Sequence, residues 1–187
     1  DCVKLELVHR LDRETSGCLM LAKDGVTLRE LHRQLRAGTM NKQYRTLMAG
    51  RLPQGTLTCL APLAMVPDGH GERRAEVSEE GAEAHTTFAG EQWFAEFTLA
   101  NVTLATGRTH QIRVHLKSLG HPILGDALYG WKPDPRLKDQ PARVMLHAEH
   151  LVLAHPATGK QLDLRAPLPA DFTALIRALR KVPRSAR

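Results

Sequence analysis

Hydrophobic residues near the start of the chain form one apolar run and then a helical pattern. The run over residues 17–22 is mostly apolar, which predicts a buried strand. Asp24 follows it and is a residue type that caps helix N-termini. Three leucines then recur at helical spacing, at Leu28, Leu31 and Leu35. With Gly38 as a stop signal, this pattern predicts a helix over about residues 26–36.

The middle of the chain is typical of strands separated by turns. We predict strands over residues 44–49, 84–88 and 94–104. Residues 52–60 contain a proline and a glycine and predict a hairpin-like connection. Residues 67–81 are rich in Gly, Glu and Asp, so we expect a flexible loop there.

Two more helices are predicted in the second half of the chain. The first begins at Thr109 and ends at Gly120, and its buried stripe consists of Ile112, Leu116 and Leu119. Arg113 lies at the border of that stripe. The second helix covers residues 170–180, and a loose tail is expected over residues 183–187.

The order of these elements predicts the fold class. Because strands dominate the middle while helices lie between and after them, we predict a mixed α/β fold of the α+β kind. There is no low-complexity linker and no internal repeat, and 187 residues suffice for one well-packed domain. We therefore interpret residues 1–187 as a single domain.

Composition narrows the class of protein. No apolar run approaches the roughly 20 residues of a membrane helix, so no membrane association is expected. The three cysteines form no CxxC pair and are odd in number, which suits a reducing cytoplasm. His147 and His150 have no matching second pair, so we expect hydrogen-bonding roles for them and no metal site. Nothing indicates an obligate dimer, and we expect a monomer.

The net charge of +6 is unevenly distributed. Residues 1–60 carry ten basic and six acidic residues, residues 61–100 carry two and eight, and residues 101–187 carry fourteen and six. The basic segments would attract a polyanion such as RNA, in a salt-dependent way, although charge alone also fits a role in solubility. We expect the acidic centre to be a solvated insertion that faces away from the RNA.

The segment HRLDRETSG, residues 9–17, holds the strongest candidate chemistry. Asp12 lies between Arg10 and Arg13, and neighbouring cations favour the ionised carboxylate. Small turn-forming residues follow, so Asp12 is expected on a tight turn that holds it rigidly, as a catalytic group must be held. The alternative is a surface turn with an arginine–aspartate pair, and the spacing alone leaves both interpretations open.

Further motifs follow in order: NKQY at 41–44, TGRTHQIRVH at 106–115, GHPILGD at 120–126, LYG at 128–130 and LHA at 146–148. Together with HRLDRETSG they resemble the pseudouridine synthases that modify structured RNA, in the large-subunit ribosomal branch. The resemblance extends from residue 9 to about residue 168. Over residues 31–50 the sequence is most similar to one ribosomal subfamily of that branch.

The resemblance implies a pseudouridine synthase fold, a largely antiparallel mixed sheet with flanking helices and a central active-site cleft. It also implies an isomerisation in which uracil is detached from ribose, turned over and rejoined through C5. The product is an isomer, so no cofactor is expected, and the sequence has no Walker loop or GxGxxG fingerprint. Relatives usually carry strands before the HRLD motif and many carry an upstream RNA-binding domain. We therefore expect residues 1–187 to be a catalytic-domain fragment.

Three catalytic residues are implied by the resemblance. Asp12 would be the essential carboxylate, which either attacks the anomeric carbon or removes the 2′ proton. Arg113 would pair with Asp12, although helix geometry alone favours a solvated arginine. Tyr44 would stack on the target base and help to move the C5 proton, whereas tyrosines in strands more often fill the core. Glu14, the other carboxylate of the motif, is expected to point elsewhere.

Contacts to the substrate or RNA are expected from Arg10, Thr15, Arg108, His110 and Ile112. Arg10 would hold the place vacated by the flipped uridine, unless it forms a salt bridge with Asp12. Arg108 stands where a helix start favours a phosphate. The arginines of the first helix, Arg29, Arg33 and Arg36, are expected to form a solvated face.

Several functions are compatible with this pattern. We predict conversion of uridine to pseudouridine in large-subunit ribosomal RNA. The alternatives are the same reaction on transfer RNA and a non-catalytic RNA-binding or folding module on the same scaffold. A base glycosylase is the closest chemical rival, but it would release free base.

Overall fold

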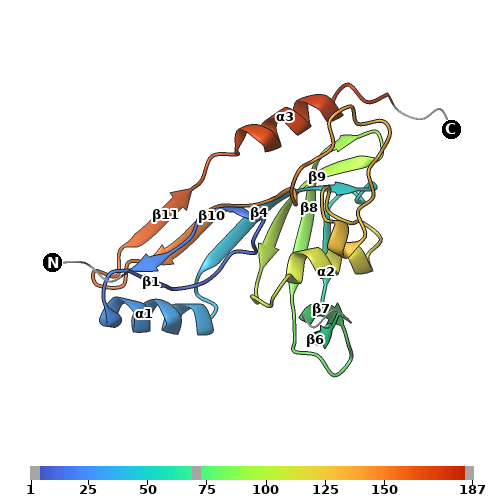
Figure 1. The fold of residues 1–187 in the computed structure, drawn as a ribbon. Helices are drawn as coiled ribbons and strands as arrows, with labels where there is room; N and C mark the ends of the chain where they lie inside the picture. The colour runs from blue at the N-terminus through green and yellow to red at the C-terminus, as the bar shows by residue number, and fades with distance from the viewer. Residues whose placement is uncertain (1–4, 69–72, 184–187) are drawn as a thin grey trace.

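The computed structural model describes residues 5–68 and 73–183, and these form one large sheet, two small sheets and three α-helices (Figure 1). The helices are α1 (Gly25–Arg36), α2 (Gln111–Ser118) and α3 (Ala170–Leu179), and a 3-10 turn, η1, covers Ala127–Tyr129. The strands are β1 (Glu6–Leu7), β2 (Ser16–Gly17), β3 (Leu21–Ala22), β4 (Asn41–Ala49), β5 (Thr56–Cys59), β6 (Leu63–Pro67), β7 (Arg73–Val77), β8 (Thr86–Phe94), β9 (Phe97–Leu104), β10 (Leu146–Ala154) and β11 (Gln161–Arg165).

The large sheet has the strand order β11–β10–β4–β9–β8–β5, and β2 pairs with β10 beside this path. All neighbouring strands on the path are antiparallel, whereas β2 runs parallel to β10. β1 pairs with β3 and β6 pairs with β7 in two separate two-stranded sheets. The predicted mixed α/β class with a mostly antiparallel sheet is confirmed.

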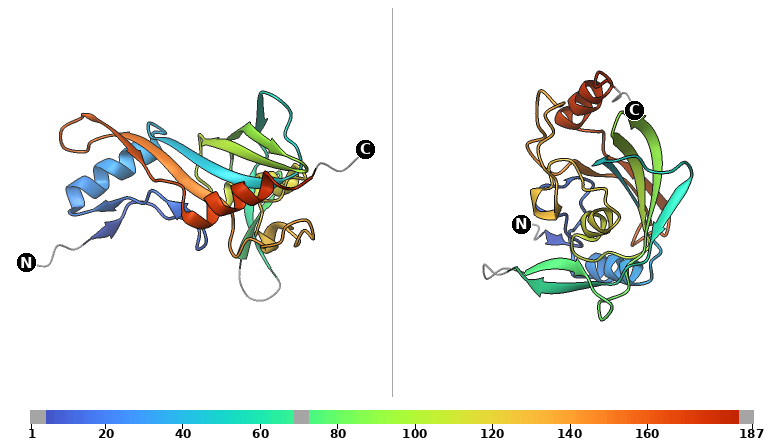
Figure 2. Two further views of the ribbon diagram at one scale, coloured as in Figure 1. Left: turned by 90° about the horizontal axis from the view of Figure 1, so that it is seen from above. Right: turned by 90° about the vertical axis from the view of Figure 1, so that its right-hand side faces the viewer.

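Each helix covers the sheet through its apolar stripe. The sheet curves around α2 (Figure 2, right), whose Ile112 and Leu116 are buried in the main core with Phe88 of β8 and Val102 of β9. α3 adds Phe172 to the same core. α1 contributes Leu31 to a second core, which also contains Leu151 and Leu153 of β10. Figure 1 shows α1 and α3 at opposite ends of the view, below and above the sheet.

The first helix lies where the sequence predicts it, whereas the strand after it, β4, begins at Asn41 rather than at Tyr44. Asp24 caps α1 by accepting a hydrogen bond from the backbone N–H of Thr27 at 2.8 Å. The predicted strands over residues 84–88 and 94–104 correspond to the hairpin of β8 and β9, although β8 extends further, to Phe94.

The buried strand predicted over residues 17–22 is wrong. The segment is divided between β2 and β3, and Leu19 and Leu21 are exposed. The chain turns because Gly17 has a left-handed φ of +120°. β3 then pairs only with β1 in a ribbon that buries alternate residues, such as Ala22.

Two connections of the middle segment also differ from the prediction. Residues 52–60 contain the edge strand β5, which pairs with β8 rather than forming a local hairpin. The loop expected over residues 67–81 contains β7, which pairs with β6, while residues 69–72 lie outside the described part. Ala75 alternates with charged neighbours and is buried, so a short strand pattern was hidden by the charged composition.

The acidic centre is not an insertion. Residues 61–100 include β8 and the first part of β9, which are strands of the large sheet. The projecting part is the β6–β7 hairpin at the bottom of Figure 1. The tail predicted over residues 183–187 falls almost entirely outside the described residues. Within the described residues, no helix has the length and apolar character needed to cross a membrane.

Candidate active site

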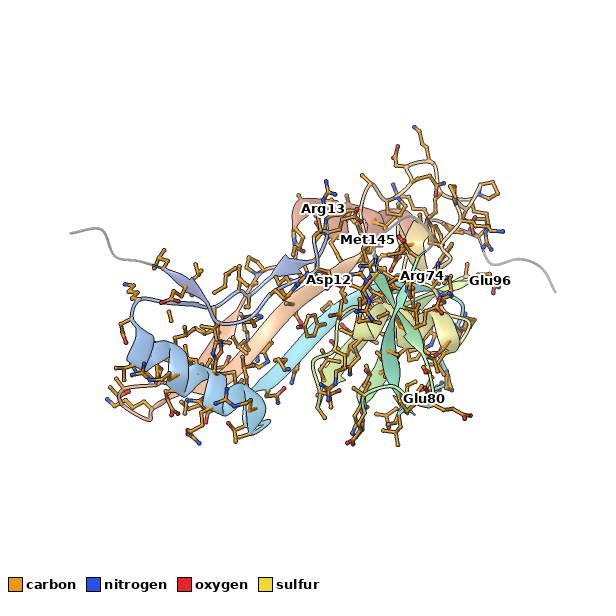
Figure 3. The ribbon with its side chains drawn as sticks, turned by 60° about the horizontal axis from the view of Figure 1, so that its bottom comes forward. Asp12, Arg13, Arg74, Glu80, Glu96 and Met145 are labelled. Atoms are coloured by element: carbon orange, nitrogen blue, oxygen red, sulfur yellow. The ribbon has the colours of Figure 1, made fainter. Side chains whose placement is uncertain are left out.

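Asp12 lies on a turn that is fastened to the large sheet. The backbone N–H of Thr15 donates to the carbonyl of Asp12 at 2.9 Å, which closes the turn. Ser16 then bonds to Nδ1 of His147 at 2.8 Å, and β2 pairs with β10. Figure 3 shows Arg13 on the outer side of this turn, away from the centre of the molecule. The predicted rigid turn is therefore present, but it is held by β10 and not by a following core strand.

Gly17 allows this close approach. A Cβ atom at this position would overlap the backbone of Ala148 in β10, and the φ of +120° is accessible mainly to glycine. Glu14 points elsewhere, as predicted: its Oε2 accepts a hydrogen bond from the backbone N–H of Val144 at 3.1 Å. The turn thus presents one carboxylate, that of Asp12.

Arg113 of α2 faces Asp12 but binds another carboxylate more closely. Its Nη1 lies 3.5 Å from Oδ2 of Asp12. Its Nε and Nη2 donate to both oxygens of Asp126, at 2.7 and 2.9 Å. The guanidinium also lies over the ring of Tyr129, with Cζ 4.9 Å from the ring centroid.

Arg113 is buried, with only 8% of the residue exposed. It therefore does not have the solvated position that helix geometry favours. The β6–β7 hairpin and the 3-10 turn η1 cover this side of α2. Arg113, at the border of the apolar stripe, is therefore buried. Burial is compensated by Asp126, which is 1% exposed and pairs with Arg113 in bidentate geometry.

His110 lies directly before α2 and approaches Asp12 from the other side. Helix α2 begins at Gln111 rather than at Thr109, and His110 is its N-cap residue, with a left-handed φ of 54° and no side-chain cap bond. Its Nε2 lies 3.9 Å from Oδ1 of Asp12. Its Nδ1 bonds to the hydroxyl of Tyr129 at 2.8 Å.

Tyr44 projects from β4 into the same cleft as Asp12. Burial and the nearby charge of Asp12 raise the pKa of Tyr44 to about 12. The phenol is therefore protonated at neutral pH. It can stack and donate a hydrogen bond, whereas a phenolate base is strongly disfavoured.

The cleft has a volume of about 590 Å³ and a distinctive charge distribution. Among the described residues that line it, Asp12 is the only acidic one. The basic side chains that line it are Arg10, Arg36, Lys42 and Arg108. Tyr44 and several aliphatic residues, including Leu104, Ile112 and Leu146, supply apolar walls. One carboxylate is thus surrounded by cations and by surface suited to a flat base.

All five residues expected to contact substrate or RNA line this cleft: Arg10, Thr15, Arg108, His110 and Ile112. Arg10 is exposed and forms no ion pair with Asp12 in the described part of the chain. Oγ1 of Thr15 is buried and has no hydrogen-bond partner among the described residues. Ile112 serves both the cleft wall and the core.

The phosphate site expected at the start of the second helix is partly occupied by the protein itself. The backbone N–H of Arg108 donates to Oε1 of Gln111 at 2.9 Å, and Nε of Arg108 donates to the carbonyl of Glu83 at 3.0 Å. Arg36, expected on a solvated face, reaches the cleft, whereas Arg33 pairs with Glu30.

Sequence reasoning missed three contributors to the site. Asp126 and Tyr129 lie within quoted motifs, but no spacing indicated that they would meet Arg113 and His110. Lys42 lines the cleft, and burial lowers its pKa. Lys42 belongs to the quoted NKQY motif and lies two residues before Tyr44, on the same face of a strand, but neither signal assigned it to the site.

The expected hydrogen-bonding roles of the two late histidines are present. Nε2 of His147 bonds to the carbonyl of Ala166 at 3.1 Å, and Nε2 of His150 bonds to Asp163 at 2.8 Å. Residues 5–68 and 73–183 contain no group of three or more side chains arranged to hold a metal ion.

Comparison with known proteins agrees with this geometry. The sequence profile of the RNA pseudouridylate synthase family matches residues 3–118. The chain belongs to this family. The ribosomal large subunit pseudouridine synthase C of Yersinia pestis is 44% identical over 179 residues, and that of Escherichia coli strain K12 is 41% identical over 180 residues. These alignments cover 95% and 94% of this chain, respectively, and 56% of each relative. The chain thus spans about half the length of the curated relatives it matches.

Solved structures confirm the pseudouridine synthase fold for this family member. Human RNA Pseudouridylate Synthase Domain Containing 4 matches with a TM-score of 0.78 and 26% identity, over 94% of this chain and 76% of that chain. Human RNA Pseudouridylate Synthase Domain Containing 1 matches with a TM-score of 0.74 and 25% identity, over 98% and 83%.

Proposed function

We propose that the protein converts specific uridines of large-subunit ribosomal RNA to pseudouridine, with Asp12 as the essential carboxylate and no cofactor. The observation that carries this proposal is the cleft in which Asp12, the single lining carboxylate among the described residues, lies among four basic side chains and Tyr44. The names of the curated relatives support ribosomal RNA as the substrate.

The arrangement fits the chemistry of the isomerisation. The N1–C1′ bond of uridine breaks, the detached uracil turns over, and C5 forms a bond to the same C1′. The hydrogen on C5 leaves as a proton and N1 takes up a proton, so the product is an isomer of uridine. Asp12 would act at the ribose, by attack on C1′ or by removal of the 2′ proton. Arg113 lies 3.5 Å from Asp12 and would hold its carboxylate in place. The walls of the cleft would retain the free uracil.

RNA would approach through the basic mouth of the cleft. Arg10 is exposed there and is available to occupy the place of the flipped uridine. Lys42 and Arg108 would lie near phosphates, and their contacts would weaken with salt. Thr15 and Ile112 line the cleft and would contact the nucleotide there. We infer a monomer acting in the cytoplasm, which fits the free thiols of Cys18 and Cys59.

The decisive experiment measures loss of the C5 hydrogen. Large-subunit ribosomal RNA transcribed with tritium at uridine C5 is incubated with the parent protein, with Asp12→Asn and with Asp139→Asn. Asp139 is an exposed aspartate that does not line the cleft, so it controls for the same chemical change. We expect tritium release and pseudouridine in the digested RNA for the parent and for Asp139→Asn, and none for Asp12→Asn.

Other outcomes distinguish the rival functions. Release of free uracil with an abasic product would identify a base glycosylase. RNA binding by a folded parent without release of tritium would indicate a binding module. Release from labelled transfer RNA, but not from ribosomal RNA, would reassign the substrate. An Asp12→Asn variant that lost folding and RNA affinity together would refute the catalytic assignment of Asp12.

A further inference from the structure

A chain of contacts connects strand β7 to the carboxylate of Asp12. The hydroxyl of Tyr129 accepts from the backbone N–H of Ala75 at 3.2 Å and lies 3.2 Å from the carbonyl of the same residue. That hydroxyl also lies 2.8 Å from Nδ1 of His110, whose Nε2 faces Oδ1 of Asp12 at 3.9 Å. The rings of His110 and Tyr129 meet edge to face, at an interplanar angle of 83°.

The tautomer of His110 depends on where the hydroxyl of Tyr129 donates its one proton, to Nδ1 of His110 or to the carbonyl of Ala75. The hydroxyl of Tyr129 has one proton, and its shortest contact is to Nδ1 of His110. If Tyr129 donates this proton, Nδ1 is the bare nitrogen and the neutral ring carries its hydrogen on Nε2. The hydrogen then points toward the carboxylate of Asp12. In the opposite tautomer the lone pair of Nε2 would face that carboxylate, which is repulsive.

The surroundings keep the ring neutral and fixed. Burial lowers the pKa of His110, with Arg113 and Arg10 acting in the same direction, while the charges of Asp12 and Asp126 oppose the shift. The left-handed backbone of His110, uncommon for a residue other than glycine, aims the side chain across the start of α2. Both features fit a neutral donor held in one orientation.

We propose that His110 is a positioning residue for Asp12, held by Tyr129 as the tautomer with hydrogen on Nε2. Arg113 faces Oδ2 of Asp12 and His110 faces Oδ1, so the carboxylate is bracketed on both oxygens. The hydroxyl of Tyr129 and the backbone of Ala75 fix the imidazole from behind. The effect of His110 on turnover rests on the proposed isomerase function, whereas the assignment of its tautomer does not.

Nitrogen-15 chemical shifts test the tautomer without any RNA. His110 is assigned in the labelled protein at pH 7.5 by the signals that disappear in His110→Asn. We expect a protonated Nε2 and a bare Nδ1 that accepts a hydrogen bond. In Tyr129→Phe the Nδ1 signal should move to the position of an imidazole nitrogen without that bond. A proton on Nδ1 in the parent, a charged ring, or an unchanged Nδ1 signal in Tyr129→Phe would overturn the proposal.

Two isosteric amides test the positioning role. The amide nitrogen of Gln reaches the place of Nε2, whereas that of Asn takes the place of Nδ1. We therefore expect His110→Gln to retain about tenfold more kcat than His110→Asn, with KM within about twofold of the parent in both. Equal losses would show that a donor at Nε2 does not matter and would refute the role. A parent inactive on every RNA would count against the proposed function, and the nitrogen shifts would still decide the tautomer.

Discussion

Arg113 is bound by Asp126 through two hydrogen bonds of 2.7 and 2.9 Å. A guanidinium has three nitrogens, so this bidentate contact uses Nε and Nη2 and leaves Nη1 directed at Asp12, at 3.5 Å. Asp126 is itself fixed, because its Oδ1 also accepts from the backbone N–H of Tyr129 at 3.2 Å. The orientation of the cation beside the candidate catalytic carboxylate is thus set by a second, buried carboxylate.

We predict that Asp126→Asn destabilises the protein and lowers turnover. It leaves the buried guanidinium of Arg113 without its closest counter-charge, which typically costs about 3 kcal/mol or more. Arg113 should then shift toward Asp12 and disturb its orientation, so we expect at least a tenfold loss of kcat. Urea unfolding and tritium release, measured where the variant is folded, check both effects.

The pair of Arg143 and Asp171 provides a matched control. It is also bidentate, at 2.6 and 3.0 Å, but the side chain of Asp171 is 48% exposed. Asp171→Asn should therefore cost less than about 1 kcal/mol and leave turnover unchanged. Equal costs for Asp126→Asn and Asp171→Asn would contradict the buried-charge argument.

Tyr44 is predicted to act as a neutral phenol. With a pKa raised to about 12 by burial and by Asp12, it contributes no ionisation to a rate profile measured between pH 6 and 10. The chain has two tyrosines, so Tyr129→Phe leaves Tyr44 as the only phenol for an absorbance titration. We expect its phenolate to form only near pH 12.

Replacement of Tyr44 separates the ring from the hydroxyl. Tyr44→Phe keeps the stacking surface and removes the hydroxyl, so we expect RNA affinity within a few-fold of the parent and a loss of kcat of about tenfold, the size of one lost hydrogen bond. Unchanged turnover in this variant would show that the hydroxyl donates no hydrogen bond that matters to the reaction.

Local signals explain which parts of the fold could be predicted. Helix α1 follows from Asp24 and its leucine stripe, because caps and amphipathic spacing act over a few residues. β7 could not be recognised in the same way: its alternation is short, and it forms by pairing with β6 and contacting α2. We predicted a loop in this segment because of its charged composition, whereas the strand forms through tertiary contacts.

The candidate site likewise has residues that the sequence indicated and contacts that it could not indicate. The resemblance indicated Asp12, Tyr44 and Arg113, and the structure brings Asp12 and Tyr44 into one cleft with Arg113 beside Asp12. The contact between Arg113 and Asp126 joins α2 to the turn before η1, and the contact between His110 and Tyr129 depends on the left-handed backbone before α2. Neither relationship follows from a periodic pattern, because both depend on how separate elements pack.

Gly17 is predicted to be essential for the position of Asp12. Gly17→Ala places a Cβ against the backbone of Ala148 and requires a residue other than glycine to adopt a φ of +120°. Backbone strain and overlap of this kind cost roughly 1–3 kcal/mol each, and relief would displace the turn that carries Asp12. We expect a clear fall in stability and loss of most turnover.

The control for this change is Gly159→Ala. Gly159 also has a positive φ, +70°, but nothing lies within 4 Å of an added Cβ. We expect Gly159→Ala to lower the free energy of unfolding by about 1 kcal/mol, the cost of the backbone conformation alone, and to keep normal turnover. If Gly17→Ala were no worse than Gly159→Ala, the close approach to β10 would not be what holds the turn.

His115 is predicted to make stability fall in mild acid. It is fully buried between Thr86 and the carbonyl of Ala61, with contacts of 2.8 and 2.9 Å, and burial lowers its pKa from the usual 6.5. Below pH 6.5 the unfolded chain therefore binds a proton at this position that the folded chain does not bind, so stability is lost as the pH falls. Burial lowers the pKa of His9 and His110 as well, which adds to the same slope.

His115→Gln removes one of these titrating groups while keeping a donor for the carbonyl of Ala61. Because the pKa of His115 is lowered in the fold, His115→Gln should lose less stability than the parent between pH 7.5 and 5.5. The difference has an upper limit of about 1 kcal/mol, which corresponds to a histidine that stays neutral in the fold. Urea unfolding at both pH values measures the difference. The comparison is made between pH values within each protein, so a general destabilisation by the substitution cancels. An identical pH dependence in parent and variant would mean that His115 takes up its proton equally in the folded and unfolded states.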